Sequence, residues 1–139
     1  MSGRLLLVGT PIGNLTDLTP RAIEALQSAD LILCEDTRHS RKLLSHFSID
    51  GPTESFHEHN EEEKTERMIE RIERGQTVAL ISDAGMPLVS DPGYRLVRAA
   101  RAKGLTIEPI PGAFAAVLAL VASGLPPHPF TFAGFTPHR

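Results

Sequence analysis

The chain has 139 residues, of which 41% are hydrophobic and 22% charged, enough for one globular domain with a full core. The formal net charge is −3 and only 5% of residues are aromatic, so the composition does not indicate a nucleic-acid-binding protein. With one cysteine, no secretory segment and no apolar run near the roughly 18–20 residues of a membrane span, a cytoplasmic protein outside the membrane is expected.

Short apolar runs alternate with helical patterns along the chain. Runs at 4–8, 31–34 and 77–81 predict buried strands, and two more strands are expected at 53–56 and 105–109. Helices are expected between and after them, at 20–28, 40–47, 61–74, 91–103 and 112–123. This alternation predicts an α/β fold, with a mainly parallel five-stranded sheet flanked by helices.

Two of these helices begin with recognisable capping residues. Thr19 is expected to cap the first helix, with Pro20 at the first helical position. Asp91 is expected to cap the 91–103 helix in the same way, with Pro92 at its first position.

The chain is expected to hold one α/β domain at 1–124 and the beginning of a second domain at 125–139. Residues 125–139 are proline-rich and contain the alternating "FTFAGF", as a linker and a first strand would. Because nothing follows that strand, we expect the second domain to be truncated. The apolar 113–121 stretch has no polar face, which predicts a helix buried between the sheet and a partner.

Four unusual loops follow the predicted strands: "GTPIGN", "EDTRHS", "SDAGMP" and "PIPGA". Loops after parallel strands converge at one edge of the sheet, where such folds bind ligands. The first loop lacks the Lys-Ser/Thr of a Walker A motif and the G-x-G-x-x-G pattern, which disfavours a nucleotide phosphate site. Two interpretations stay open for it: a tight turn in which Asn14 helps the helix entry, or a backbone lining a ligand cleft.

Charged residues gather in the second loop and in the loop after the third strand. The second loop forms either a local ion pair before a helix capped by Thr37 or part of a functional site, and its charged or titratable residues are Glu35, Asp36, Arg38 and His39. His57 and the second histidine of "HEHN" have no third and fourth ligand at metal-site spacing, so no metal site is predicted.

A stripe of arginines recurs every three residues on the 91–103 helix. Arg95, Arg98 and Arg101 are typical of a solvated helix face, and contacts to RNA phosphates are the alternative interpretation.

Taken together, the loops resemble the tetrapyrrole methylase family, the class III S-adenosylmethionine methyltransferases. The resemblance covers essentially the whole chain, in order, through "TPIGNLTDLTPRA", "EDTRHSRKLL", "HEHNEEEK", "SDAGMPLVSDPGYRLV" and "PIPGAFAAVLALVASGLP". Within the family, these motifs are most similar to enzymes that methylate a ribose 2′-hydroxyl of a cytidine in small-subunit ribosomal RNA. The resemblance implies a two-domain enzyme with its cofactor in the cleft between the domains, of which this chain is the N-terminal domain.

The same resemblance implies that S-adenosylmethionine contacts six residues of this chain: Ile12, Ser82, Asp83, Met86, Phe114 and Ala115. Asp83 has the clearest chemistry, because a carboxylate accepts hydrogen bonds from an ammonium group and from ribose hydroxyls. Met86 and Phe114 depart from the family pattern, which usually has a threonine and a small or polar residue there. We expect both departures to reshape the adenine side of the pocket.

The nature of the acceptor decides which catalytic groups are needed. A ribose hydroxyl is a poor nucleophile at neutral pH, so a positioned base is useful, whereas an electron-rich tetrapyrrole carbon needs less help. We predict Asp36 or Glu35 as the base or orienting group, and Arg38 as a contact to an RNA phosphate.

Three functions remain open at this point. A ribosomal RNA 2′-O-methyltransferase is favoured, with small-subunit ribosomal RNA or the small ribosomal subunit and a second copy of the chain as partners. A C- or N-methyltransferase acting on a corrin or porphyrin precursor is the second, and a non-catalytic fragment that binds S-adenosylmethionine is the third. The net charge of −3 opposes RNA binding by this chain alone, and the isolated chain is expected to show little activity.

Overall fold

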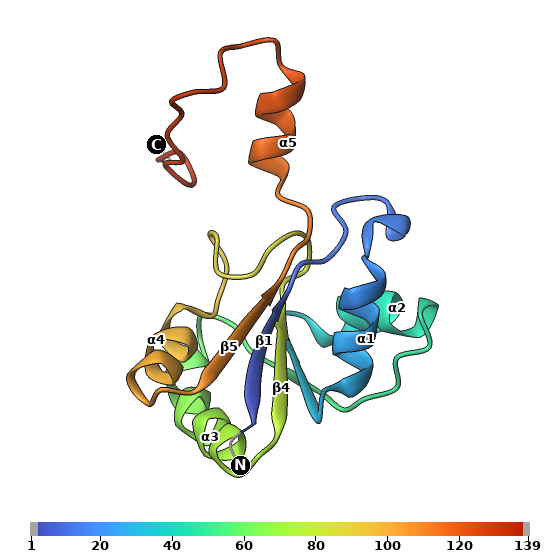
Figure 1. Cartoon of the computed structure of the whole chain (residues 1–139), viewed down its shortest axis with the longest axis vertical. Coiled ribbons are helices and arrows are strands. Elements are labelled where there is room, and N and C mark those ends of the chain that lie inside the picture. Colours follow the sequence, from blue (N-terminus) through green and yellow to red (C-terminus); the bar gives the residue numbers. More distant parts are fainter. Residues whose placement is uncertain (1–2, 138–139) are drawn as a thin grey trace.

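A five-stranded sheet forms the centre of the computed structural model, which describes residues 3–137 (Figure 1). All four strand pairings are parallel, and the strand order is β3-β2-β4-β1-β5. The strands are β1 (Arg4–Val8), β2 (Leu31–Cys34), β3 (Thr53–Ser55), β4 (Thr77–Ile81) and β5 (Thr106–Ile110). The predicted α/β fold with a parallel five-stranded sheet is therefore confirmed.

Helices cover both faces of this sheet. They are α1 (Pro20–Ser28), α2 (Thr37–His46), α3 (Glu61–Glu73), α4 (Tyr94–Ala102) and α5 (Ala115–Ala122), with a short 3-10 helix η1 (Leu15–Asp17). The pair α1 and α2 lies on one face and the pair α3 and α4 on the other, each over its own apolar cluster (Figure 1). The all-apolar runs form strands because both sides of each central strand are buried under helices. None of the helices in the described residues is long and apolar enough to cross a membrane.

Strand register aligns the carboxyl ends of three neighbouring strands, β1, β4 and β5. Val8 at the end of β1 pairs with Ile81 of β4 on one side and with Ile110 of β5 on the other. All three strands therefore end level, and the loops that follow them begin side by side.

The start of α4 differs from the prediction. Asp91 does not cap this helix, which begins at Tyr94 after Gly93, a residue with a φ of 130°. The free N–H groups of Gly93 and Arg95 both donate to Oε1 of Glu61, each at 3.0 Å. Glu61, at the first position of α3 and only 8% exposed, therefore takes the capping role that the sequence assigned to Asp91. By contrast, the Thr19 cap of α1 is confirmed, because its hydroxyl accepts from the N–H of Ala22 at 3.0 Å.

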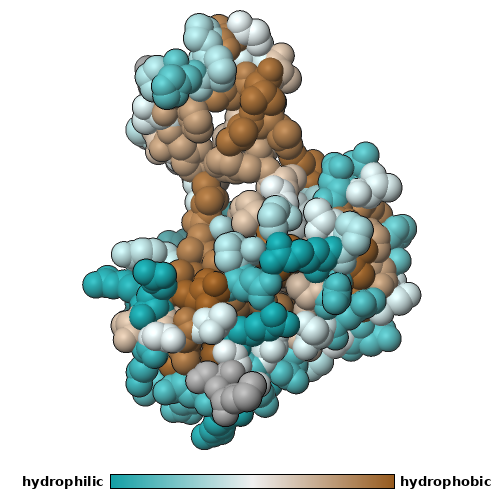
Figure 2. Space-filling view, in the orientation of Figure 1, coloured by the Kyte–Doolittle hydropathy of each residue, from teal (hydrophilic) through white to brown (hydrophobic). Residues whose placement is uncertain are grey.

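The C-terminal arm, residues 115–137, stands away from the sheet (Figure 1). The prediction that its helix is buried is wrong for this chain, since α5 has no buried residue. Hydrophobic surface gathers on the arm and where the arm joins the rest of the molecule (Figure 2). The exposed hydrophobic side chains of the arm include Val121, Leu125 and Phe135. Residues 125–137 form no strand, because no other strand among the described residues lies beside them. The predicted division at 124 stays a prediction, and its last two residues, 138–139, lie outside the described part of the chain.

Candidate functional site

The loops after β1 and β4 are joined by hydrogen bonds at the carboxyl edge of the sheet. Thr10 and Gly85 exchange two backbone hydrogen bonds of 3.0 Å each. The buried hydroxyl of Thr10 donates to the carbonyl oxygen of Ser82 at 3.3 Å, and the hydroxyl of Ser82 donates to that of Gly85 at 2.9 Å. These short polar side chains fix the geometry of both loops.

The loop after β5 joins the same assembly through a contact between glycines. A Cβ atom on Gly9 would lie 2.6 Å from the Cα of Gly112, and one on Gly112 would lie 2.5 Å from the Cα of Gly9. Only glycine allows two backbones to approach this closely. The three loops therefore form one rigid wall, which favours the interpretation of "GTPIGN" as a loop that lines a ligand cleft.

An apolar pocket of about 310 Å³ lies between this wall and the C-terminal arm. Four of the six residues expected to contact a cofactor line it: Ile12, Met86, Phe114 and Ala115. Phe132 of the arm closes the other side, with its ring centroid 5.5 Å from that of Phe114.

The other two expected cofactor residues, Ser82 and Asp83, line a second pocket of about 250 Å³, here called the α2 pocket. His39 and Lys42 of α2 face the first loop across this pocket. The Nε2 atom of His39 lies 3.1 Å from the backbone carbonyl oxygen of Asp83, in position to donate a hydrogen bond to it. Because Ala84 and Gly85, which directly follow Asp83, line the apolar pocket, the two pockets share the segment 83–85 as a wall.

The side chain of Asp83 is the least satisfied polar group of this wall. Its Oδ1 atom is buried and has no hydrogen-bond partner among the described residues. An unpaired buried carboxylate oxygen is costly, so such a group in a native fold calls for an explanation, of which a binding or catalytic role is one. Asp83 is therefore suited to a ligand that donates hydrogen bonds.

A third pocket, of about 360 Å³, holds four carboxylates, those of Glu35, Glu58, Glu61 and Asp91. Burial raises the pKa of Glu35 above its ordinary value, and the charges of Asp83 and Asp91 raise it further. Burial followed by the charge of Asp83 also raises the pKa of Asp91. Glu35 therefore holds its proton to a higher pH than a free glutamate.

The remaining predicted catalytic residues lie at the start of α2. Oδ1 of Asp36 accepts from the N–H of Arg38 at 3.0 Å and from that of His39 at 3.5 Å. Asp36 is thus the cap of this helix, a role that one interpretation of the sequence gave to Thr37. The Arg38 side chain is exposed and forms no ion pair within residues 3–137.

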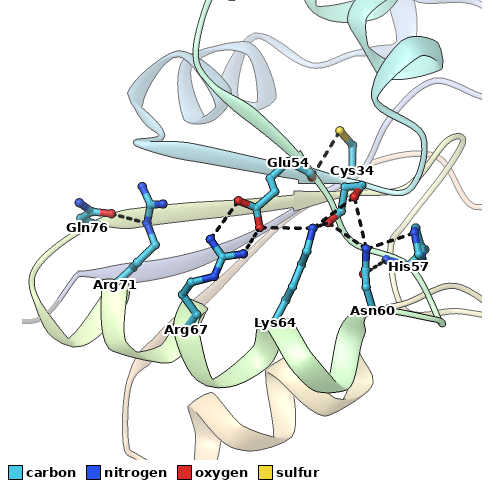
Figure 3. Close-up of polar contacts among 9 residues, drawn as sticks. Cys34, Glu54, His57, Asn60, Lys64, Arg67, Arg71 and Gln76 are labelled. Carbon is cyan, nitrogen blue, oxygen red and sulfur yellow. Dashed lines mark hydrogen bonds and ion pairs between the residues drawn. The ribbon is translucent and has the colours of Figure 1, made fainter.

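The histidine loop after β3 serves the turn into α3 (Figure 3). Asn60 accepts from the N–H of His57 at 2.8 Å, and its amide lies 3.1 Å from Nε2 of the same residue. Nearby, burial pushes the pKa of Glu54 upward, but hydrogen bonds and charge from Arg67 and Lys64 outweigh it and lower this pKa (Figure 3). No group of three or more His, Cys, Asp and Glu side chains in the described part of the chain is arranged to hold a metal ion.

Sequence reasoning missed two residues of the site. Lys42 lines the α2 pocket, and its spacing of four residues from Arg38 on a helix is a signal that could have revealed it. Glu61 gave no local signal, because the N–H groups that it caps lie more than thirty residues further along the chain.

Comparison with known proteins assigns this architecture to a family. A profile of the "Tetrapyrrole (Corrin/Porphyrin) Methylases" matches residues 4–135. The chain belongs to the tetrapyrrole methylase family. The resemblance found in the loop motifs is thereby confirmed.

Among curated tetrapyrrole methylase relatives, "Ribosomal RNA small subunit methyltransferase I" of Xylella fastidiosa is 54% identical over 137 residues, which cover 99% of this chain and 50% of the relative. The protein of the same name from Escherichia coli O157:H7 is 51% identical, covering 99% of this chain and 48% of its own length. The chain therefore spans about half the length of the curated relatives it matches.

Solved structures of other proteins share the fold. The uroporphyrin-III-C-methyltransferase of Thermus thermophilus superposes with a TM-score of 0.68 at 31% identity, over 91% of this chain and 55% of that one. Diphthine synthase superposes with a TM-score of 0.66 at 22% identity, over 86% of this chain and 49% of that one, a likeness of fold alone.

Proposed function

We propose that the chain is the cofactor-binding half of an S-adenosylmethionine-dependent methyltransferase that acts on a ribose 2′-hydroxyl of a cytidine in small-subunit ribosomal RNA. The observation that carries this proposal is Asp83, whose buried Oδ1 lacks a partner at the wall shared by two pockets. The relatives that are 51% and 54% identical, both named ribosomal RNA small subunit methyltransferases, support the choice of RNA. A ribosomal substrate would also place the protein in the cytoplasm.

The residues around the shared wall fit S-adenosylmethionine. This cofactor supplies a methyl group on a positively charged sulfur. Asp83 would accept hydrogen bonds from its ammonium or ribose hydroxyls, the donors that the unpartnered oxygen lacks. Ile12, Met86, Phe114 and Ala115 would contact its apolar parts in a pocket of about 310 Å³, within the size range of small-molecule sites. Ser82 would act through its hydroxyl, which holds the turn behind Asp83.

Glu35 is the better candidate for the general base, because it lies near Asp83, which lines the α2 pocket, and itself lines the neighbouring acidic pocket. A base works best when its pKa approaches the working pH, and burial together with two nearby carboxylates raises the pKa of Glu35. Asp36 uses one carboxylate oxygen to cap α2, so we assign it the orienting role instead. In that role it would hold Arg38 at the edge of the site, where the guanidinium would contact an RNA phosphate.

A tetrapyrrole methyltransferase is the second candidate. The observation in its favour is the likeness to uroporphyrin-III-C-methyltransferase, but at 31% identity it is weaker than the likeness to the ribosomal RNA enzymes. The third candidate, a fragment that binds the cofactor without turnover, would show cofactor binding and no methyl transfer to either substrate.

We further propose a second domain beginning in residues 125–139, and we call the resulting longer protein the two-domain protein. Support comes from the length of the relatives and from the exposed apolar side chains of the C-terminal arm. A closed cleft needs both walls to exclude water, so the 139-residue chain alone should transfer little or no methyl. The same surface is exposed in the 139-residue chain, which supports self-association of that chain into homodimers, and sedimentation at high concentration would test it.

Labelled cofactor and small ribosomal subunits that lack the modification provide the decisive experiment. The two-domain protein should label the RNA, and the labelled linkage should resist alkali, because alkaline cleavage of RNA needs a free 2′-hydroxyl. Nucleoside digestion should place the label on cytidine. Labelling of a porphyrin precursor without labelling of the RNA would replace this proposal with the second candidate.

A further inference from the structure

The net charge of −3 conceals an uneven distribution of charge across the sheet. Helix α3 carries six acidic and three basic residues, so its net charge of −3 equals the net charge of the whole chain. Helix α2, "TRHSRKLLSH", carries three basic residues, two histidines and no acidic residue. The two helices lie on opposite faces of the sheet (Figure 1), so helix α2 is a locally basic element in a protein that is acidic overall.

Two cations on the other face of the sheet are already paired with carboxylates. Arg95 on α4 pairs with Glu62 at 2.9 Å, and Lys64 on α3 pairs with Glu54 at 3.4 Å. Within residues 3–137, Arg38 and Lys42 form no ion pair, and both are exposed. Their charges are therefore not neutralised by the fold and are available to an anionic partner.

The third cation of the helix, Arg41, has a hydrogen-bond partner but no carboxylate partner in the described part of the chain. Its guanidinium donates to the hydroxyl of Thr53 at 2.9 Å, which fixes the side chain without neutralising its charge. A fixed cation contributes to an anion site at a smaller entropic cost than a mobile one.

This helix is placed where an RNA acceptor has to arrive. Lys42 and His39 line the α2 pocket together with Asp83, which also forms the wall of the proposed cofactor site. Arg38 and Lys42 are four residues apart, so they lie on one face of the helix, with their Cβ atoms about 5–6 Å from each other. A strand of RNA along this face would have its phosphates on the cations and a ribose at the pocket.

We propose that Arg38, Arg41 and Lys42 form the surface that binds the phosphate backbone of a single-stranded RNA segment, and that the α2 pocket receives the acceptor ribose. This inference rests on the proposed function and deepens it. The stripe on α4 is left out of the surface, because α4 lies on the opposite face of the sheet from the α2 pocket, and one of its three arginines, Arg95, is already paired with Glu62.

Salt dependence of RNA binding tests this surface in the two-domain protein. The probe is a fluorescent single-stranded oligonucleotide of small-subunit ribosomal RNA sequence, titrated over a series of salt concentrations. Each lost phosphate contact should reduce the slope of log affinity against log salt by about 0.7, so R38Q/K42Q should reduce it by about 1.4. At 0.1 M salt this corresponds to a loss of roughly fivefold in affinity for each contact.

Two further variants separate charge from packing and one helix from another. R38K/K42R retains both charges and should keep the wild-type slope. R98Q/R101Q removes the same charge from exposed positions on α4 and should also keep it. Cofactor affinity of R38Q/K42Q, measured by calorimetry, should match the wild type, because neither residue is among the six proposed to contact the cofactor and neither forms a hydrogen bond or ion pair with Asp83 among the described residues.

The inference is overturned if R38Q/K42Q keeps the wild-type slope, if R98Q/R101Q reduces the slope by a similar amount, or if the wild type does not bind RNA. It is also overturned if R38Q/K42Q loses affinity for a polycarboxylate porphyrin and not for RNA. Methyl transfer by the wild type is scored separately. Methyl transfer to RNA with an unchanged R38Q/K42Q slope would support the proposed function and reject the surface. A reduced R38Q/K42Q slope without methyl transfer to RNA would support the surface and reject the proposed function.

Discussion

The two halves of the segment between β4 and α4 use similar residues in different ways. In the first half, 82–86, the hydroxyl of Ser82 and the backbone of Gly85 hold the turn, while Oδ1 of Asp83 has no partner among the described residues. In the second half, 87–93, Leu88 and Ser90 adopt left-handed backbone angles, and the N–H of Gly93 donates to Glu61.

The first half therefore presents a carboxylate, whereas the second half leads into α4 and is hydrogen-bonded to α3 through Glu61. Sequence reasoning expected one aspartate for the ligand and one for the fold. The second assignment is wrong, because the capping carboxylate comes from Glu61 of α3 and not from Asp91. The second half thus depends on a residue on a neighbouring helix, while the first depends on the loop after β1.

Gly93→Ala should have the largest effect on stability. Gly93 has a φ of 130°, and a Cβ atom there would lie 2.6 Å from a methyl carbon of Leu80 and 2.7 Å from one of Leu88. Backbone strain and overpacking each cost about 1–3 kcal/mol, so we expect a loss of about 2–5 kcal/mol in the free energy of unfolding. Chemical denaturation of the variant measures it, and Gly51→Ala, with ordinary contacts at 3.7 Å, is the control.

Glu61→Ala should follow, with a loss of about 2–4 kcal/mol, because two backbone N–H groups lose a buried, charged acceptor. Its neighbour provides a matched control. Glu62 is 85% exposed in its side chain and pairs with Arg95 at the surface, so Glu62→Ala should cost less than about 1 kcal/mol. Equal losses in the two variants, measured by denaturant titration, would contradict the capping role of Glu61.

Asp83→Asn should weaken S-adenosylmethionine binding by about 1.5–3 kcal/mol, because a charge-assisted hydrogen bond is lost. The protein should be as stable as the wild type or slightly more stable, since no group of the described residues donates to Oδ1 and the charge of Asp83 repels those of Glu35 and Asp91. Calorimetric titration of the two-domain protein with the cofactor measures the first effect, and thermal melts measure the second. Normal cofactor binding by the variant would remove Asp83 from the proposed site.

Local patterns were sufficient for most of the fold and insufficient for the site. The runs at 4–8, 31–34 and 77–81 became strands with the predicted bounds, because central strands of a parallel sheet must be apolar on both faces. The start of α4 was missed by two residues, because it depends on Glu61 and on left-handed angles at Leu88 and Ser90. Side chains distant in sequence, and angles that non-glycine residues rarely adopt, leave no local pattern.

The arrangement of the site was hidden for a related reason. The family resemblance named Asp83 and Met86 together, but the structure places them on two pockets that share the wall at 83–85. Which side of a turn each residue faces depends on the contacts of the turn with other loops. Here those contacts are the Thr10–Gly85 bridge and the approach of Gly9 to Gly112, and neither is visible in the sequence.

Asp91→Ala should have the smallest effect and the opposite sign to a lost cap. A capping aspartate would cost about 0.5–2 kcal/mol when replaced by alanine. In this structure burial and the charge of Asp83 raise the pKa of Asp91 above its reference value of 3.8, so the ionised form is disfavoured in the fold. At pH 7 the variant should therefore be as stable as the wild type or slightly more stable, within about 0.5 kcal/mol.

The pH dependence of this difference provides the sharper measurement. A carboxyl with a raised folded pKa destabilises the fold above that pKa, and the penalty disappears as the pH falls through it towards the unfolded value of 3.8. Any advantage of Asp91→Ala in thermal melts should thus shrink between pH 7 and pH values near 4. A loss of stability that is greatest at pH 7 would instead indicate that Asp91 carries a stabilising charge, and the division of the segment into two halves would be wrong.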